Sequence, residues 1–288
     1  MTAPYVFDVG ANTGQFGLEL AIRNPSANVH LFEPIPELCT IMEEEIKRLK
    51  LENVTIHQYG IASNSGIAKL NISKLGDWGV SSTHQFNDEN IFGNRYWQIR
   101  KDLSYSEQIE IEVKRLDEVI LEHNIEKIDF IKIDTQGMDI DVLISLGNQI
   151  DKLEAGFLEC PATKFTSLYQ NETDLLYALQ FLADKGLKAL YIKPNDESCN
   201  EVNVFFAKSP EKWNNLKTTL SLSGNEIFSG KDFWSYPSST LETNSAIVRI
   251  KELSARTIAL DKEVNRLNKE IERLNNFILE QKSDVLPN

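Results

Sequence analysis

The sequence is poor in cysteine, has no long apolar run and lacks a surplus of positive charge. Its three cysteines, Cys39, Cys160 and Cys199, show neither a CxxC spacing nor the spacing of metal ligands. We therefore expect these cysteines to be small buried core residues or free thiols, in a protein of a reducing compartment. No run approaches the about 18 apolar residues of a membrane span, and the N-terminus lacks the basic and apolar regions of a signal peptide. The sequence predicts a cytoplasmic protein without a transmembrane segment.

The charge balance argues against two classes of partner. Acidic residues number 43 against 30 basic ones, which gives a net charge of −13. A chain this acidic is poorly suited to bind nucleic acid or an anionic membrane, and the same charge disfavours a polyanionic acceptor. At 288 residues the chain is long enough for one sizeable α/β domain and an appendage.

A glycine-containing loop near the N-terminus lacks both common phosphate-binding motifs. In "VFDVGANTGQFGLELA", an apolar run ends in Asp8, Gly10 and Gly14 bracket small and polar residues, and a helix pattern follows. A P-loop needs a Lys-Ser/Thr pair after its second glycine, and a dinucleotide fingerprint needs G-x-G-x-x-G; this sequence has neither. The loop therefore suits a ligand without a pyrophosphate, with its polar end near Asp8 and Asn12.

The next strand pattern adds a second feature of this ligand. The segment "ANVHLFEP" contains Glu33, about twenty residues past the loop. In a βαβ unit, an acidic residue at that place accepts hydrogen bonds from both hydroxyls of a ribose. The ligand is then a nucleoside with a tail other than phosphate, for which S-adenosylmethionine is the candidate.

Strand and helix patterns alternate through most of the chain. This order predicts an α/β fold with a doubly wound, mostly parallel sheet, whose ligand crevice lies at the carboxyl ends of the strands. An irregular stretch rich in aromatic residues, 76–106, interrupts the alternation. Strands are expected near 5–9, 28–33, 53–58, 108–113, 128–134, 155–159, 187–193 and 201–207, and helices near 14–23, 36–50, 115–124, 138–146 and 172–185.

The last part of the chain differs from the domain predicted for 1–208. Residues 209–243 form a Ser/Gly-rich connector, and 244–282 are predicted to form a coiled coil. A single helix folded back on the domain would drift toward a 3.6-residue period, whereas this seam keeps a strict 3,4 spacing. β-branched residues at a and Leu at d favour a homodimer, with a trimer still open. The seam residues are Ile250, Leu253, Thr257, Leu260, Val264, Leu267, Ile271, Leu274 and Ile278.

An ordered set of motifs resembles the FkbM-type methyltransferases. The set is "VFDVGANTGQFG", "LFEPIPE", "NVTIHQYGIASNSG", "GVSS", "RLDEVI", "IDFIKIDTQGMDIDVLISLG", "FLEC", "LADKGLKALYI" and "EVNVFFAK", and it covers about residues 5–207. The resemblance implies a Rossmann-like methyltransferase fold that uses S-adenosylmethionine, with its last strand inserted antiparallel. Such enzymes usually methylate hydroxyl groups of sugars or natural products.

Three features depart from the family pattern. Gln136 stands where the family usually has the Glu of "KIDxEG". The chain opens almost at its first strand, without the upstream segment that often covers the cofactor. Nothing in the family pattern predicts the coiled coil.

The predicted cofactor site combines the loop with the ends of the next two strands. Asp8 and Asn12 are expected at the methionine end, Gly10 and Gly14 give clearance, and Glu33 takes the ribose. Alternatively, the glycines serve an ordinary tight turn, and Gly60 and Ile61, expected at the adenine, form a simple strand exit. The predicted set is Asp8, Gly10, Ala11, Asn12, Gly14, Glu33, Pro34, Gly60 and Ile61.

Methyl transfer to an alcohol needs a base or a metal, because a protonated alcohol is a poor nucleophile. Asp134 and Glu159 end neighbouring predicted strands, where two carboxylates serve as base and orienter or hold a divalent cation. The structural alternative for Asp134 is to cap the helix that begins near Met138. Lys132 faces away from Ile133 by strand alternation, so its head group is expected to be structural.

His84 is the second candidate base, since it lies in the aromatic stretch and a histidine titrates near neutral pH. His30, His57 and His123 fall in predicted strands and a helix, where structural roles are expected. The surrounding aromatics either stack on sugar faces or form a small core that orders the loop. The function predicted is an S-adenosylmethionine-dependent O-methyltransferase for a sugar or glycan, self-associated through the coiled coil. A natural-product O-methyltransferase and a non-catalytic scaffold are the alternatives.

Overall fold

The structure, a computed structural model, describes residues 3–73, 78–100, 102–196 and 198–222. The predicted coiled coil and most of the predicted connector lie outside these residues, and so do Gly76, Asp77 and Lys101 of the aromatic stretch. In the part of the chain that is described, no helix is long and apolar enough to cross a membrane.

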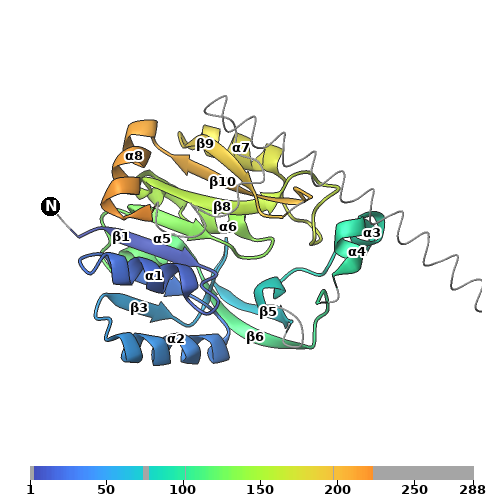
Figure 1. Ribbon diagram of the computed structural model, residues 1–288, viewed down its shortest axis with the longest axis horizontal. Coiled ribbons are helices and arrows are strands. Elements are labelled where there is room, and N and C mark those ends of the chain that lie inside the picture. The colour runs from blue at the N-terminus through green and yellow to red at the C-terminus, as the bar shows by residue number, and fades with distance from the viewer. Residues whose placement is uncertain (1–2, 74–77, 101, 197, 223–288) are drawn as a thin grey trace, which may run out of the picture. The chain divides into compact units, whose positions relative to one another are not determined.

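The main sheet has seven strands in the order β3-β2-β1-β7-β8-β10-β9 (Figure 1). β3, β2, β1, β7 and β8 run parallel, and β10 is antiparallel to both of its neighbours. This confirms the predicted doubly wound, mostly parallel sheet with its last strand inserted antiparallel. The strands are β1 (Tyr5–Val9), β2 (Asn28–Phe32), β3 (Val54–His57), β7 (Phe130–Ile133), β8 (Ala155–Pro161), β9 (Lys188–Pro194) and β10 (Glu201–Ala207).

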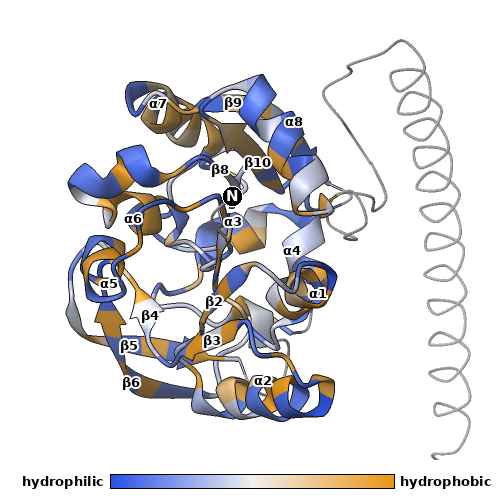
Figure 2. Ribbon diagram, turned by 90° about the vertical axis from the view of Figure 1, so that its left-hand side faces the viewer, coloured by the Kyte–Doolittle hydropathy of each residue, from blue (hydrophilic) through white to orange (hydrophobic). Residues whose placement is uncertain are grey.

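Helices cover both faces of this sheet. Side chains of α1, α2 and α8 pack on one face, and those of α5, α6 and α7 pack on the other. The helices are two-coloured in Figure 2, as amphipathic elements around a buried sheet should be. Their bounds are α1 (Gln15–Arg23), α2 (Pro36–Leu49), α5 (Leu116–Glu122), α6 (Asp139–Ile144), α7 (Leu175–Asp184) and α8 (Pro210–Thr219), with a short 3-10 helix η2 (Gly147–Lys152) after α6.

Helix α8 lies in the segment that the sequence assigned to the connector. Ser209 caps it by accepting the N–H of Lys212, and Pro210 occupies its first turn. Trp213 packs against aromatic residues of β7, β9 and β10, with its ring 5.9 Å from that of Phe205. The domain therefore continues past residue 208, and the predicted start of the connector at 209 is too early. The buried Trp213 is the signal that sequence reading missed.

A second, three-stranded sheet has the order β4-β6-β5. Leu70, Ile111 and Val113 on the apolar side of this sheet pack against Ile35 and Leu38 at the start of α2. The bounds are β4 (Gly60–Ile61), β5 (Gly66–Ile72) and β6 (Glu107–Lys114).

The aromatic stretch forms a small core of its own. Trp97 is buried with Leu168 and Tyr169, and Phe86 and Tyr96 pack against them. This favours the predicted alternative in which the aromatics order the loop. The stretch contains a 3-10 helix η1 (Trp78–Val80) and two short helices, α3 (Asp88–Gly93) and α4 (Arg95–Ile99).

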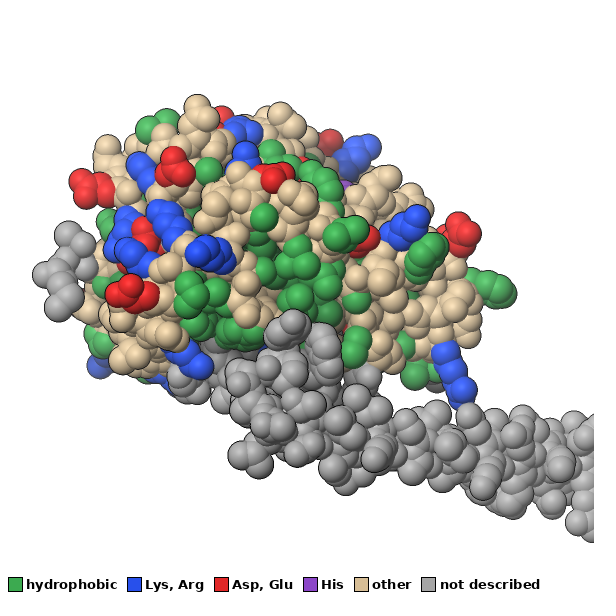
Figure 3. Space-filling model, turned by 90° about the horizontal axis from the view of Figure 1, so that it is seen from above, with side chains coloured by type: hydrophobic (Ala, Val, Ile, Leu, Met, Phe, Trp, Pro, Cys, Tyr) green, Lys and Arg blue, Asp and Glu red, His purple; other side chains and the backbone are tan. Residues whose placement is uncertain are grey.

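The surface seen from above carries charges of both signs. Basic side chains gather beside acidic ones on one part of this face, and apolar side chains lie toward its middle (Figure 3). The described part of this face therefore shows no purely basic patch of the kind that binds nucleic acid.

Candidate active site

A cavity opens at the carboxyl ends of β1, β2 and β7, and the second sheet forms its far side. It holds about 910 Å³ of empty space with its mouth included, within the range of small-molecule sites. Seven predicted residues line it, namely Gly10, Asn12, Glu33, Pro34, Gly60, Ile61 and Asp134. Five other predicted residues are not among the described lining residues: Asp8, Ala11, Gly14, His84 and Glu159.

The two loop glycines make room for the protein itself. Gly10 has φ of +74°, and a Cβ there would lie 1.9 Å from the carbonyl oxygen of Asp134. Gly14 has φ of +78°, and a Cβ there would lie 2.9 Å from the Met42 side chain. The predicted clearance for a ligand is therefore wrong as the reason for these glycines. They are needed because the loop has a left-handed backbone and lies directly against β7 and α2.

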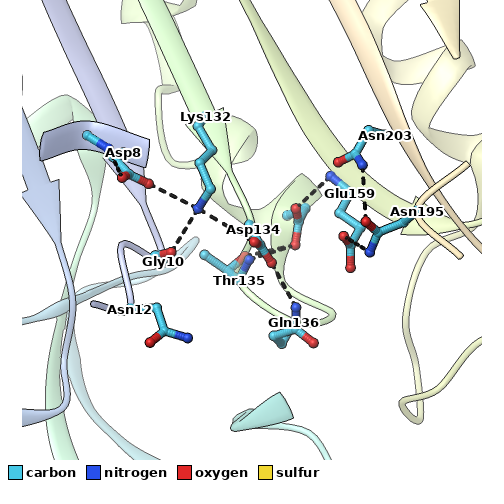
Figure 4. A network of polar contacts seen from close by, with 12 residues as sticks. Asp8, Gly10, Asn12, Lys132, Asp134, Thr135, Gln136, Glu159, Asn195 and Asn203 are labelled. Atoms are coloured by element: carbon cyan, nitrogen blue, oxygen red, sulfur yellow. Dashed lines mark hydrogen bonds and ion pairs between the residues drawn. The ribbon is translucent and has the colours of Figure 1, made fainter. Parts of the chain in front are cut away.

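Asp8 supports the loop from beneath. Its carboxylate is fully buried, accepts the Gly17 N–H at 3.0 Å and lies 3.0 Å from Lys132 Nζ. The Lys132 ammonium also donates to the Gly10 carbonyl at 2.9 Å and lies 3.6 Å from Asp134 (Figure 4). Burial lowers the pKa of Lys132, but the nearby Asp8 and Asp134 carboxylates outweigh it and hold this pKa above its ordinary value. Asp8 thus fixes the loop through Lys132 and does not reach the cavity.

Lys132 is the central residue that the sequence reading undervalued. The register pairs Lys132 with Asp8, and strand alternation directs Lys132 and Asp134 to the same face. A lysine inside a buried strand needs carboxylate partners, because an isolated buried charge is very costly. That pattern in "IDFIKID" was the available signal.

Glu33 ties the loop to the end of β2. One carboxylate oxygen accepts the Asn12 N–H at 2.8 Å, and the other accepts the Ile35 N–H at 3.0 Å. Burial raises the pKa of Glu33 to about 7, opposed by these two N–H donors. Each oxygen keeps a lone pair for a further donor. Glu33 and Asp134 are the charged side chains among the described residues of the cavity wall.

The far end of the cavity is apolar. Ile35 and Leu38 at the start of α2 face Ile61, Leu70 and Val113 of the second sheet across this space. Gly60 and Pro34 complete this part of the wall. Such a slot suits a flat, weakly polar ring system.

Asp134 presents its carboxylate at the polar end of the cavity, with 35% of its side chain exposed. It accepts a hydrogen bond from Gln136 Nε2 at 2.7 Å. The N-cap of α6 is Met138 and no side-chain hydrogen bond caps this helix, so Asp134 does not have the capping role that was its structural alternative. Asp139 accepts the Thr135 N–H at 3.1 Å and the Thr135 hydroxyl at 3.0 Å.

Asp134 and Glu159 follow the last register pair of β7 and β8, Ile133 and Leu158, and the two carboxyl groups interact electrostatically. Glu159 is not among the described residues of the cavity wall. Its carboxyl group instead accepts a hydrogen bond from Asn195 at 2.6 Å. Burial raises its pKa well above the ordinary value, and the Glu201 carboxylate adds to this. Within the described ranges, no group of three or more His, Cys, Asp or Glu side chains is arranged to hold a metal ion.

His84 also lies outside the described cavity wall. Its ring is close to Gly137, where an added Cβ would lie 3.4 Å from His84 Nδ1. Burial lowers the pKa of His84, opposed by Asp141 and by a hydrogen bond to Gln170. The structure thus joins His84 to the loop after β7, and not to the cavity.

The remaining histidines and the three cysteines, which were not expected to be catalytic, differ in their burial. His30 and His57 form a buried pair, Nδ1 to Nε2 at 2.8 Å, and burial lowers their pKa values to about 4 and about 3. His123 is the exposed C-cap of α5. Cys39 and Cys160 are buried, as expected for small core residues, whereas Cys199 is an exposed free thiol at the turn before β10.

The sheet order and a cavity at the carboxyl ends of the strands define a Rossmann-like α/β fold with a ligand site at its expected place. The methyltransferase FkbM domain matches residues 8–189, and the chain belongs to this family. Among curated relatives, the AMB antimetabolite synthetase AmbE of Pseudomonas aeruginosa is 31% identical over 160 residues, which are 49% of this chain and 8% of that protein.

Two further relatives carry methyltransferase names. Methyltransferase 1 of Beauveria bassiana is 24% identical over 50% of this chain and 59% of its own length. The 2-O-methyltransferase NoeI of Sinorhizobium fredii is 26% identical over 65% of this chain and 74% of its own length. The chain therefore spans less than two thirds of the synthetase and of the Beauveria protein.

The cavity fits S-adenosylmethionine, the cofactor that membership of this family implies. A partly satisfied carboxylate, Glu33, separates an apolar slot from a polar end that contains Asn12 and Asp134. An adenosyl group with a charged amino-acid tail has the same sequence of apolar, hydroxylated and charged parts.

Proposed function

We propose that the chain is an S-adenosylmethionine-dependent O-methyltransferase that acts on a hydroxyl of a sugar or glycan. One observation carries this proposal. The wall of a single cavity contains a ribose-type carboxylate, Glu33, and a partly exposed carboxylate, Asp134, at the end of β7. The first suits the cofactor and the second suits a base for the acceptor.

The cofactor would be held by residues already fixed in place. Glu33 would accept the ribose hydroxyls with the lone pairs that Asn12 and Ile35 leave free. The apolar slot around Leu38 and Val113 would hold the adenine, and the loop at Gly10 and Asn12 would meet the methionine end. When bound, this cofactor supplies an electrophilic methyl group on a sulfonium, whose C–S bond breaks as the new O–C bond forms.

The chain itself contributes position and proton transfer. Asp134 would take the proton of the acceptor hydroxyl, because its carboxylate is partly exposed in the cavity wall and acts as a hydrogen-bond acceptor. Lys132, whose ammonium lies 3.6 Å from Asp134, would help to hold this carboxylate in place. The apolar wall and Trp78 would exclude water from the methyl group.

Two observations bear on the acceptor. The name of the NoeI relative specifies transfer to oxygen, which supports O-methylation here. The antimetabolite synthetase relative favours a small natural-product acceptor as the second candidate. The self-association expected from the seam at 250–278 would favour a multivalent glycan, since linked active sites gain avidity only on repeated acceptors.

A transfer screen tests the proposal. Wild-type chain and Asp134→Asn are incubated with methyl-labelled cofactor and with nucleotide-linked sugars, glycan fragments and hydroxylated small molecules. Transfer to a sugar hydroxyl that depends on Asp134 supports the proposal, and transfer to small molecules alone would favour the second candidate. No transfer together with no cofactor binding would leave a non-catalytic scaffold as the function.

A further inference from the structure

The Gln136 side chain forms hydrogen bonds with Asp134 and with Tyr169, a buried residue of a loop distant in the sequence. Its side-chain Nε2 donates to Asp134 Oδ1 at 2.7 Å, and its Oε1 accepts the Tyr169 hydroxyl at 2.7 Å. The Ser82 hydroxyl donates to its backbone carbonyl at 2.6 Å. These three contacts hold Gln136 at φ of +52°, a conformation that non-glycine residues seldom adopt.

The contacts fix which way the amide points. Tyr169 is 1% exposed, and its hydroxyl donates to Gln136, with the Val80 carbonyl 3.1 Å away as a second acceptor. A flipped amide would place its oxygen against the Asp134 carboxylate, which is repulsive when that group is ionised. The tyrosine therefore directs the amide N–H toward Asp134.

A glutamate at this position would have the opposite effect. It would keep the shape and could accept the Tyr169 hydroxyl, but it has no N–H to donate to Asp134. Two carboxylate oxygens at 2.7 Å would have to share a proton, because like charges that close cannot both remain ionised. In this chain the amide can therefore donate to Asp134 without supplying a proton of its own, whereas the Glu usual in the family could donate at this place only in its protonated form.

We propose that Gln136, oriented by Tyr169, is the positioning residue that sets the direction and the charge state of the Asp134 carboxylate. This rests on the proposed function, in which Asp134 is the base. Its role differs from that of Lys132, which stabilises the same carboxylate by charge alone. Gln136 donates to Oδ1 of Asp134 and Oδ2 lies 3.6 Å from Lys132 Nζ, so the carboxylate is held at both oxygens and keeps lone pairs for an acceptor hydroxyl.

Five other charged side chains interact electrostatically with Asp134 and therefore influence its titration. None of them is altered in the variants below. They are Lys132 on the same strand, Asp8 of β1, Asp139 of α6, Glu159 of β8 and Glu201 of β10.

The test is an NMR titration of the Asp134 carboxyl carbon, assigned with Asp134→Asn, which needs no acceptor. In Gln136→Glu the midpoint should rise by about one pH unit or more, because the carboxyl pair retains a proton. The matched control is Gln180→Glu on α7, where the amide donates to Asp184 at 2.8 Å on an exposed surface. This control adds the same charge and should leave the Asp134 midpoint unchanged. An unchanged midpoint in folded Gln136→Glu would overturn the proposal.

Tyr169→Phe decides the case if Gln136→Glu does not fold. Without the hydroxyl the amide can rotate, so the midpoint of Asp134 should rise by a smaller amount, and an unchanged midpoint would overturn the proposal. Cofactor binding by each folded variant, measured by calorimetry, keeps this result apart from the proposed function. A wild-type chain that binds no cofactor refutes the function, whereas the titration still reports on Gln136 and Tyr169.

Discussion

The buried ion pair beneath the glycine loop gives the most quantitative prediction. Lys132→Met keeps the length of the side chain but removes the ammonium 3.0 Å from Asp8. The two side chains are 7% and 0% exposed, so Asp8 would remain as an uncompensated buried carboxylate. Breaking one partner of such a pair costs about 3–5 kcal/mol of unfolding free energy.

The matched control is a surface pair with an even shorter contact. Arg48 and Glu45 on α2 lie 2.6 Å apart, with side chains 66% and 38% exposed. Arg48→Met should therefore cost no more than about 1 kcal/mol, because solvent screens an exposed pair. Urea denaturation of both variants compares the two losses. Equal losses would refute the argument that burial, and not distance, decides the effect.

The pH dependence of the Lys132→Met loss identifies its cause. Burial already raises the pKa of Asp8 in the folded chain, opposed by the charge of Lys132. Without Lys132 this pKa should rise further, so that Asp8 takes up a proton in the folded chain. The folded state then binds more protons than the unfolded state, and stability falls by about 1.4 kcal/mol per pH unit as the pH rises above about 4. A loss independent of pH would show that Asp8 is not the group left unpaired.

Three further predictions follow from the site and the tail. Asp134→Asn should lower the transfer rate by about 10²–10⁴ with little change in unfolding free energy or cofactor affinity, and a near-normal rate would exclude Asp134 as the base. Because burial raises the Glu33 pKa to about 7, cofactor affinity should weaken below pH 7, approaching tenfold per unit, as protonation removes the ribose acceptor. A dissociation constant that stays flat between about pH 5.5 and 8 would contradict this. Deleting the residues after 243, or placing Asp at both Leu260 and Leu267, should convert an oligomer into a monomer that still binds cofactor, since unpaired charges cannot be buried in the seam. Equal masses in sedimentation would mean that the predicted seam does not join chains.

The fold followed from sequence because its signals are local. Strands such as 28–33 and helices such as 36–50 carry their periodicity within a few turns of chain, and the order of the motifs gave the topology. The position of Glu33 at the glycine loop followed for the same reason, since its distance from this loop is fixed within one βαβ unit. Helix α8 was missed because a single tryptophan, Trp213, anchors a helix whose other residues are mostly polar.

The errors in the site come from contacts between distant segments. The reason for Gly10 is the Asp134 carbonyl, which approaches it from more than a hundred residues away. Tyr169, which orients Gln136, belongs to a loop without any motif. Asp134 fitted the capping pattern because an Asp shortly before a helix is a common cap, whereas in the fold α6 begins at Met138 without a side-chain cap.

Calorimetric titration with S-adenosylmethionine tests the central claim most directly. At pH 8 the wild-type chain should bind one cofactor per chain. Glu33→Ala should weaken binding by about 10–150-fold, the equivalent of a charge-assisted contact of about 1.5–3 kcal/mol. Equal affinity of the two chains, or no binding by the wild type, would contradict the account of this cavity as the cofactor site.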